Sequence, residues 1–335
     1  MFSSQPTDSV REGIVYRKSQ GVYTVQHQGQ IVQCAISSKL RKHLIQWGGI
    51  SQSTNIRREI KEVREIDQVD PVAIGDRVYF IEAPGSSGLI VEVAERRNKL
   101  SRLSSGPRPI EQVIVANVDQ IIPVFAARNP APKWALLDRY LAAAESAGIP
   151  SVIVITKSDQ LRPQDHSLID VIELYRRIGY RVLLTSTVTG EGLDEFAYVI
   201  ESSASVMIGK SGVGKSSLLN AVQPGLGLRV NAVSEATGKG KHTTTHLEMF
   251  PLDSGGSIVD TPGMREFGLW ADPDAGGLAH LFVEMRPSIG ACRFGLDCTH
   301  DHEPGCAIKQ AVEQGDIAEM RYHSYLRLLA DDTAE

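Results

Sequence analysis

The sequence predicts a multidomain protein with an N-terminal β-barrel, a central α/β domain and a C-terminal helical domain that holds a metal. Three observations support this prediction. Short β-rich runs fill the first hundred positions, a glycine-rich phosphate-binding motif lies between a strand and a helix, and three cysteines gather with a histidine near the end of the chain. A chain of 335 residues is long enough for two or three domains.

Composition and charge exclude several classes of protein. The chain is 42% hydrophobic and 22% charged, as is typical of a globular protein. Its net charge of −5 means that any nucleic-acid contact must come from a local basic patch. No apolar run approaches the ~20 residues of a membrane span, and the N-terminus lacks the apolar core of a signal peptide. We therefore expect a cytoplasmic monomer with no membrane contact.

Five β-rich runs separated by turn residues predict an OB-type barrel over residues 10–102, after a disordered N-terminus at 1–9. The runs are 13–16, 21–25, 30–35, 76–81 and 88–93. Segment 46–70 is polar and charged and is interpreted as a long loop between strands. Cys34 is interpreted as a buried strand residue. Basic residues gather at 39–42 and 96–102, which fits either a solvated face or contact with RNA, and RNA contact is slightly favoured only because of the motifs further along the chain.

Residues 103–285 alternate strands with helices, which predicts a doubly wound parallel sheet. The expected strands are 118–125, 151–155 and 181–184, and the expected helices are 134–147 and about 167–178. In the run 151–155 every residue after Ser151 is apolar, as in a strand buried on both faces. Ligands of such sheets bind at the carboxyl ends of the strands, so polar residues that follow these strands are candidate site residues.

The most specific motif matches G-x-x-x-x-G-K-[ST], the P-loop that binds phosphates. It follows an apolar strand and opens a helix, which makes a mobile surface loop an unlikely alternative. Lys215 is expected to reach the β- and γ-phosphates, and Ser216 to supply an oxygen to Mg²⁺. The predicted nucleotide-binding residues of this loop are Gly209, Lys210, Ser211, Gly212, Val213, Gly214, Lys215, Ser216 and Ser217.

Two weaker motifs follow the predicted strands 151–155 and 181–184. Thr156, Lys157, Ser158 and Asp159 resemble the guanine-binding N/TKxD motif of GTPases, with Thr156 in place of Asn. The Asp159 carboxylate can accept hydrogen bonds from the N1–H and the N2 amine of guanine, a donor pair that adenine lacks. Taken alone, such a tetrapeptide at a strand end is more often a simple helix N-cap. The second motif includes Ser186 and Thr187 and resembles the G5 loop that supports the base.

The segment 238–245 resembles switch I, since it follows the P-loop helix and is rich in glycine, lysine and threonine. One threonine hydroxyl there is expected to complete the Mg²⁺ shell, and Thr244 is favoured over Thr243 and Thr245. His242 is a candidate catalytic residue that positions the attacking water. The alternative is a solvated loop with no nucleotide contact.

Asp260 and Gly263 fit the DxxG element of switch II. Asp260 is expected to hold Mg²⁺ through water, and the Gly263 amide to meet the γ-phosphate. Met264 stands where Ras-like proteins carry a glutamine that orients water, which predicts slow intrinsic hydrolysis. Conventional GTPases place the P-loop and switches before the base-binding motifs, and this chain has the opposite order. The sequence therefore predicts a circularly permuted GTPase domain whose switch II leads directly into the C-terminal domain.

The C-terminal segment 286–330 contains a candidate structural zinc site. Three cysteines and one histidine close a tetrahedron and leave no open position for catalysis. His300 is favoured as the fourth ligand, and His302 is the alternative. The predicted ligands of one Zn²⁺ per chain are Cys292, Cys298, His300 and Cys306. Amphipathic helices are expected over 307–330, followed by a tail at 331–335.

Taken together, these motifs resemble the bacterial small-subunit-dependent GTPases of the RsgA/YjeQ type over residues 10–330. The most specific matches are the P-loop and the segments 240–245, 260–268 and 292–306, and 116–120 and 137–141 also match. The chain departs from the family in having one more residue between Cys292 and Cys298 and a long segment at 46–70.

The resemblance implies late maturation of the 30S ribosomal subunit. The family binds 16S rRNA through its barrel and zinc domains, and the subunit stimulates hydrolysis of GTP to GDP. Two other functions remain open from the sequence. One is a GTP-gated RNA-binding module whose turnover is incidental, and the other is a P-loop ATPase or kinase, against which Asp159 argues.

Overall fold

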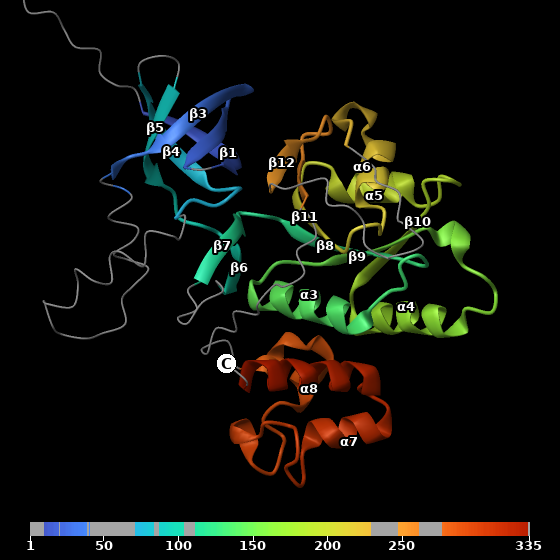
Figure 1. The fold of residues 1–335 in the computed structure, drawn as a ribbon. Coiled ribbons are helices and arrows are strands. Elements are labelled where there is room, and N and C mark those ends of the chain that lie inside the picture. The colour runs from blue at the N-terminus through green and yellow to red at the C-terminus, as the bar shows by residue number, and fades with distance from the viewer. Residues whose placement is uncertain are drawn as a thin grey trace, which may run out of the picture.

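Figure 1 shows the fold as a computed structural model, which describes residues 10–19, 21–38, 40, 71–83, 87–103, 111–228, 247–260 and 277–333. A β-barrel, an α/β domain and a helical part follow one another from blue to red, which confirms the predicted fold class. The predicted disordered N-terminus, 1–9, and the predicted loop, 46–70, lie outside the described residues.

The N-terminal part is a closed barrel built from five of the described strands. They are β1 (Arg11–Ser19), β2 (Val22–His27), β3 (Gln30–Ile36), β4 (Arg77–Ala83) and β5 (Ser87–Val93). They pair in the order β1–β2–β3–β5–β4 and back to β1, and only the β3–β5 pair among them is parallel. Cys34 lies buried in the barrel core beside Tyr23 and Phe80, as predicted. The pairing order confirms the OB-type barrel.

A hairpin that the sequence patterns did not predict joins the barrel to the central domain. Its strands are β6 (Lys99–Leu103) and β7 (Glu111–Ala116), and the expected boundary between residues 102 and 103 falls within β6. The Asn98 side chain bonds both backbone groups of Val118, at 2.7 and 3.0 Å, and the Asn117 amide donates to the Gly75 carbonyl at 3.0 Å. These bonds fix the junction, while the domain limits themselves stay predictions.

The central sheet has the strand order β10–β9–β8–β11–β13–β12. Its strands are β8 (Gln120–Ala126), β9 (Val152–Thr156), β10 (Arg181–Thr185), β11 (Ala204–Ile208), β12 (Glu248–Pro251) and β13 (Ser257–Asp260). All neighbouring strands are parallel except β12, which runs antiparallel to β13. Every residue of β9 and β13 is buried, as expected for strands covered on both faces.

Helices cover both faces of this sheet, as the doubly wound pattern predicted (Figure 1). They are α3 (Trp134–Ser146), α4 (His166–Ile178), α5 (Leu193–Ile200) and α6 (Lys215–Val222). Leu137 of α3 and Tyr175 of α4 belong to one core, whereas Phe196 of α5 and Leu218 of α6 belong to another. The sequence analysis had not predicted α5. Within the described residues, no helix has the length and apolar character needed to span a membrane.

The barrel continues the central sheet. Strand β1 pairs antiparallel with β12 and sets Arg17 opposite Glu248, with 4.0 Å between the guanidinium and the carboxylate. Met249 of β12 belongs to the same buried core as Ile74, which lies shortly before β4 in the chain. Tyr16 of β1 packs against this core. The barrel therefore lies beside β12, the outermost strand of the central sheet.

The C-terminal part consists of 3₁₀ turns and two described helices, α7 (Ala307–Gln314) and α8 (Glu319–Thr333). Helix α8 runs past Asp331, where the sequence placed the start of a tail, because Asp331 to Thr333 includes no helix-breaking residue. Arg321 of α8 is fully buried and bonds Asp138 of α3 at 2.6 Å and Glu284 at 2.6 and 3.1 Å. This ion cluster fastens the C-terminal part to the central domain.

Candidate functional site

The predicted P-loop lies between β11 and α6, and its backbone requires glycine at three places, one of which is Gly212 with φ +82°. A Cβ atom on Gly209 would lie 2.3 Å from the carbonyl oxygen of Val124 in the neighbouring strand. Gly214 has φ +102°, in the left-handed region that favours glycine. The loop can thus curl so that its amides and the positive end of α6 face one anion. The nucleotide contacts predicted for 209–217 stay predictions.

Lys215 is a buried cation that bonds backbone oxygens. Its side chain is 9% exposed, and its ammonium donates to the carbonyls of Gly209 at 2.7 Å and Lys210 at 3.3 Å. Burial lowers the pKa of Lys215, and the nearby Asp260 carboxylate opposes that shift. Neither hydrogen bond neutralises the charge, so the site favours an anionic ligand such as phosphate.

Asp260 ends β13 and is 5% exposed. Its Oδ1 atom has no hydrogen-bond partner among the described residues, and burial raises the pKa of its carboxyl while Lys215 opposes that shift. A buried acceptor without a partner costs about 1–3 kcal/mol. Such an oxygen fits the hydrated Mg²⁺ of a nucleotide site, and Ser216 in the first turn of α6 can offer a hydroxyl to the same ion.

The predicted base-binding segment is tied to the P-loop by two side chains. The Thr156 hydroxyl, at the end of β9, donates to the Val213 carbonyl. The Lys157 ammonium donates to the carbonyl of Gly212 at 2.9 Å and to that of Asn129. Burial lowers the pKa of Lys157, which Asp159 partly offsets. These bonds give Thr156 and Lys157 a role that the motif alone did not indicate, which is to fasten the two halves of the site together.

Asp159 and Ser186 come from neighbouring loops and contact each other directly. The Ser186 hydroxyl donates to Oδ1 of Asp159 at 2.5 Å and accepts the amides of Val188 at 3.1 Å and Thr189 at 3.2 Å. Ser158 donates to the Glu191 carboxylate at 2.6 Å. Thr187, the other predicted residue of the second loop, is exposed. The structure thus brings the two predicted base-binding motifs together around Asp159.

The predicted switch residues His242, Thr244, Gly263 and Met264 lie outside the described residues. Their roles in water activation, Mg²⁺ binding and γ-phosphate contact stay predictions.

All described site segments meet at one edge of the sheet. Strands β9, β10, β11 and β13 run parallel, so their carboxyl ends share that edge. The chain reaches the predicted base-binding ends of β9 and β10 before the predicted phosphate-binding ends of β11 and β13. The spatial site is intact while its sequence order is permuted, as predicted.

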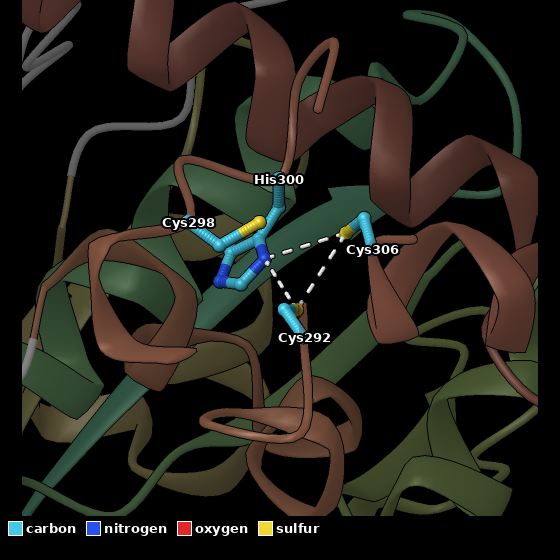
Figure 2. Close-up of side chains that lie close together, drawn as sticks. All are labelled: Cys292, Cys298, His300 and Cys306. Atoms are coloured by element: carbon cyan, nitrogen blue, oxygen red, sulfur yellow. Dashed lines mark hydrogen bonds between the residues drawn. The ribbon is translucent and has the colours of Figure 1, made fainter. Parts of the chain in front are cut away.

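A second candidate site lies in the C-terminal part. Figure 2 shows Cys292, Cys298, His300 and Cys306 with their side chains turned toward one another. One potential ligand atom from each residue falls within 4.8 Å of all the others, and all four residues are buried. Cys292 Sγ lies 3.8 Å from Cys306 Sγ and 3.4 Å from His300 Nδ1, and Cys306 Sγ lies 3.5 Å from His300 Nδ1.

These separations fit a tetrahedral metal site. Zinc–sulfur bonds of about 2.3 Å would place two sulfurs of a tetrahedron about 3.8 Å apart. Burial lowers the pKa of His300, which favours the neutral imidazole that binds metals. The alternative ligand His302 is excluded by position, because its side chain is 84% exposed and faces Asp301. The four predicted ligands are therefore the ones that the fold brings together.

Sequence reasoning missed Glu191 and Asn129. Glu191 lies between Gly190 and Gly192, which both have positive φ. The Gly-Glu-Gly sequence, which indicates a tight turn that carries a carboxylate, was the signal available for this residue. Asn129 acts through its carbonyl, and nothing in a side-chain pattern indicates a backbone contact.

Comparison with known proteins agrees with this geometry. The family model described as RsgA GTPase matches residues 93–270. The small ribosomal subunit biogenesis GTPase RsgA of Gemmatimonas aurantiaca is 45% identical over 259 residues, which cover 77% of this chain and 83% of that protein. The protein of the same name from Bacteroides fragilis is 35% identical over 322 residues, or 96% of each chain.

Solved structures are similar over the whole length. YjeQ from Thermotoga maritima matches with a TM-score of 0.69 and 31% identity, covering 96% of this chain and 98% of that chain. YloQ, a circularly permuted GTPase, matches with a TM-score of 0.65 and 29% identity, covering 98% and 97%. The family model spans more than half of the sequence and the relatives align over most of it. The chain therefore belongs to the RsgA GTPase family and is a GTP hydrolase.

Proposed function

We propose that this protein hydrolyses GTP during late maturation of the small ribosomal subunit, as a cytoplasmic monomer. Its barrel and C-terminal part would bind ribosomal RNA, and the 30S subunit would stimulate turnover. The observation that carries the proposal is the bonding of the 156–159 segment both to the P-loop and to Ser186. The names of the relatives, small ribosomal subunit biogenesis GTPases, support the ribosomal part.

Guanine selection rests on Asp159. One of its oxygens already accepts the Ser186 hydroxyl, which orients the carboxylate and leaves lone pairs for the N1–H and the N2 amine of guanine. Adenine offers no such donor pair and would leave the carboxylate without a partner, which costs about 1–3 kcal/mol. This chemistry favours GTP over the ATPase or kinase alternative.

Phosphate chemistry rests on the P-loop, Lys215 and Asp260. The loop amides and the Lys215 ammonium would hold the β- and γ-phosphates in place. Ser216 and Asp260 would hold Mg²⁺, which, when bound, neutralises charge on those phosphates. The proposed Mg²⁺ contact of Thr244 and the water-positioning role of His242 complete the site at residues that the structure does not describe.

The C-terminal cluster of Cys292, Cys298, His300 and Cys306 would hold one structural Zn²⁺. The donor set, the burial and the spacing support this metal. With four protein ligands, the metal has no open position for a substrate, so its role would be to stabilise the fold of the C-terminal part.

The central experiment is GTP turnover with and without purified 30S subunits. We expect slow hydrolysis by the free protein and a marked increase with 30S. Lys215→Ala should lower both rates by about 10²- to 10³-fold, which separates true stimulation from contaminating hydrolases. An unchanged rate with 30S would overturn the enzyme-on-ribosome proposal and favour the GTP-gated RNA-binding module.

Guanine specificity is tested by Asp159→Asn. We expect GTP affinity to fall by about 10- to 100-fold, as measured by equilibrium binding of fluorescent GTP. Asp170→Asn is the matched control, since Asp170 is exposed on α4. Unchanged GTP affinity in the Asp159 variant, or preferential ATP binding by the wild type, would contradict the guanine site.

The metal is tested by elemental analysis of wild type and Cys298→Ser. Wild type should carry one equivalent of zinc, and the variant should lose it together with stability of the C-terminal part. Cys34→Ser is the control, because Cys34 lies in the barrel core away from the cluster. Zinc retention by the Cys298 variant, or a wild type without zinc, would contradict the assignment.

A further inference from the structure

Two hydrogen bonds cross between the loops that follow β9 and β10. Ser186 of the second loop donates to Asp159 of the first at 2.5 Å, and Ser158 of the first donates to Glu191 of the second at 2.6 Å. Each loop thus supplies one hydroxyl and one carboxylate to the other. We name these four residues the loop clasp.

The second loop holds Glu191 in a defined place. The Ser186 amide donates to the Glu191 carbonyl at 2.9 Å, and the Gly190 amide donates to the Ser186 carbonyl at 3.0 Å. A Cβ atom on Gly192 would lie 2.1 Å from the Leu184 carbonyl oxygen, so the turn packs closely against the end of β10. The Glu191 carboxylate is therefore presented by a closed turn rather than by a free loop.

The first loop depends on this support. Ser158 is 7% exposed and begins a single 3₁₀ turn, Ser158–Gln160, that contains Asp159. Lys157, just before it, has φ +57°, an uncommon conformation for a residue other than glycine. A turn this short has few internal bonds, so the contact of Ser158 with Glu191 helps to set where the Asp159 carboxylate points.

We propose that Glu191 is a positioning residue for guanine selection. Through Ser158 it fixes the loop that carries Asp159, so that both carboxylate contacts to the base form at once. Loss of the Glu191 contact lets the turn rotate, and the bond to the exocyclic N2 amine weakens. This inference rests on the proposed guanine site and adds to it a residue that does not touch the base.

The test compares GTP with inosine triphosphate, which lacks the N2 amine. Glu191→Ala should weaken GTP binding by about 3- to 10-fold and inosine triphosphate binding much less, so the affinity ratio falls. The KM for GTP should rise while kcat stays near the wild-type value, because the phosphate end of the site is untouched. Glu191→Gln should restore most of the ratio, since its amide oxygen can still accept from Ser158.

Two further variants isolate the clasp. Ser158→Ala should reproduce the effect of Glu191→Ala, and the double variant should be no worse than either single one. Glu195→Ala is the matched control, because Glu195 on nearby α5 pairs only with exposed Arg181 among the described contacts. Circular dichroism checks that all variants fold.

Several outcomes would overturn the inference. An unchanged affinity ratio in Glu191→Ala would do so, and so would additive effects in the double variant or a failure of the Gln variant to restore the ratio. If Asp159→Asn weakens GTP binding while Glu191→Ala does not, the guanine site stands and the positioning role fails. If neither variant changes GTP binding, the guanine site itself fails.

Discussion

Lys215 and Arg321 are both buried cations, and their surroundings differ. Arg321 bonds two carboxylates, those of Asp138 and Glu284, and its guanidinium lies 4.7 Å from the centre of the Phe282 ring. Lys215 bonds two backbone carbonyls and has the buried Asp260 nearby. The charge of Arg321 is neutralised by carboxylates within the fold, whereas the charge of Lys215 is not fully compensated and favours an anionic ligand.

The pKa shifts follow this difference. Burial alone would lower the pKa of Arg321, but Asp138 and Glu284 reverse that effect and raise it. For Lys215 burial prevails and the pKa is lowered. In this fold, the buried cation paired by carboxylates joins two parts of the chain, whereas the buried cation that bonds only backbone oxygens lies at the proposed nucleotide site.

The largest expected effect is on turnover at Lys215. Lys215→Met should lower kcat for GTP by about 10²- to 10³-fold, because it removes the charge that we propose to stabilise the transferred phosphate. Its thermal midpoint should stay equal to or above that of the wild type, since a poorly compensated buried cation is also removed. Single-turnover hydrolysis and calorimetry measure both quantities.

Lys309→Met, on α7, serves as the control for charge removal. A Lys215 variant that lost several kcal/mol of stability would contradict the comparison, because Lys215 would then be a structural cation like Arg321.

The next effect is on stability at Arg321. Arg321→Met should lower the free energy of unfolding by about 3–5 kcal/mol, because Asp138 and Glu284 are left buried and without their partner. Urea unfolding measures this loss, and GTP turnover per folded molecule should change little.

Neutralising Asp138 and Glu284 as well tests whether uncompensated charge causes the stability loss in the Arg321 variant. The triple variant Arg321→Met, Asp138→Asn, Glu284→Gln should recover a large part of the lost stability. If the triple variant is no more stable than Arg321→Met, uncompensated charge is not the cause of the loss.

The smallest expected effect on stability has the opposite sign. Asp260→Asn should raise the free energy of unfolding by about 0.5–2 kcal/mol while it abolishes Mg²⁺-dependent turnover. Asp253→Asn, in an exposed turn, should change neither quantity. A stability loss in the Asp260 variant would show that its carboxylate stabilises the fold of the free protein.

The pH dependence of this effect has a defined direction. Burial raises the folded-state pKa of Asp260 above its ordinary value of 3.8. Folding therefore favours the protonated carboxyl, and this contribution is lost as pH rises through the folded-state pKa. The stability advantage of Asp260→Asn should be small below pH 3.8 and reach its full value at neutral pH, as urea titrations at several pH values would measure.

Much of this architecture could be predicted from the sequence because local patterns carry it. The helix around Leu137 follows from the spacing of its apolar residues, the barrel strands from β-rich runs bounded by turn residues, and the buried strand at 152–156 from its continuous apolar run. The cysteine ligands were predictable because the whole set lies within a short segment. His300 was distinguished from His302 only by burial, which is a tertiary property.

The remaining features depend on contacts between distant residues. Arg321 and Asp138 are 183 positions apart, and an arginine in a terminal amphipathic helix is ordinarily a surface residue. The bond of Thr156 to the P-loop carbonyl at Val213 requires two strand ends to be neighbours, which no local pattern specifies. The β6–β7 hairpin was also missed, although the segment 104–109 between its strands is rich in serine, glycine and proline, which are turn residues.

The pairing of β1 with β12 has a consequence for any attempt to study the catalytic domain alone. Without the barrel, β12 would be an outer strand with unpaired amides and carbonyls, beside a Met249 side chain that has lost part of its covering. Exposed strand edges of this kind recruit other chains. A fragment beginning near residue 111 should therefore self-associate at concentrations where the full chain stays soluble. The barrel would then protect this protein from aggregation by covering the outer strand β12.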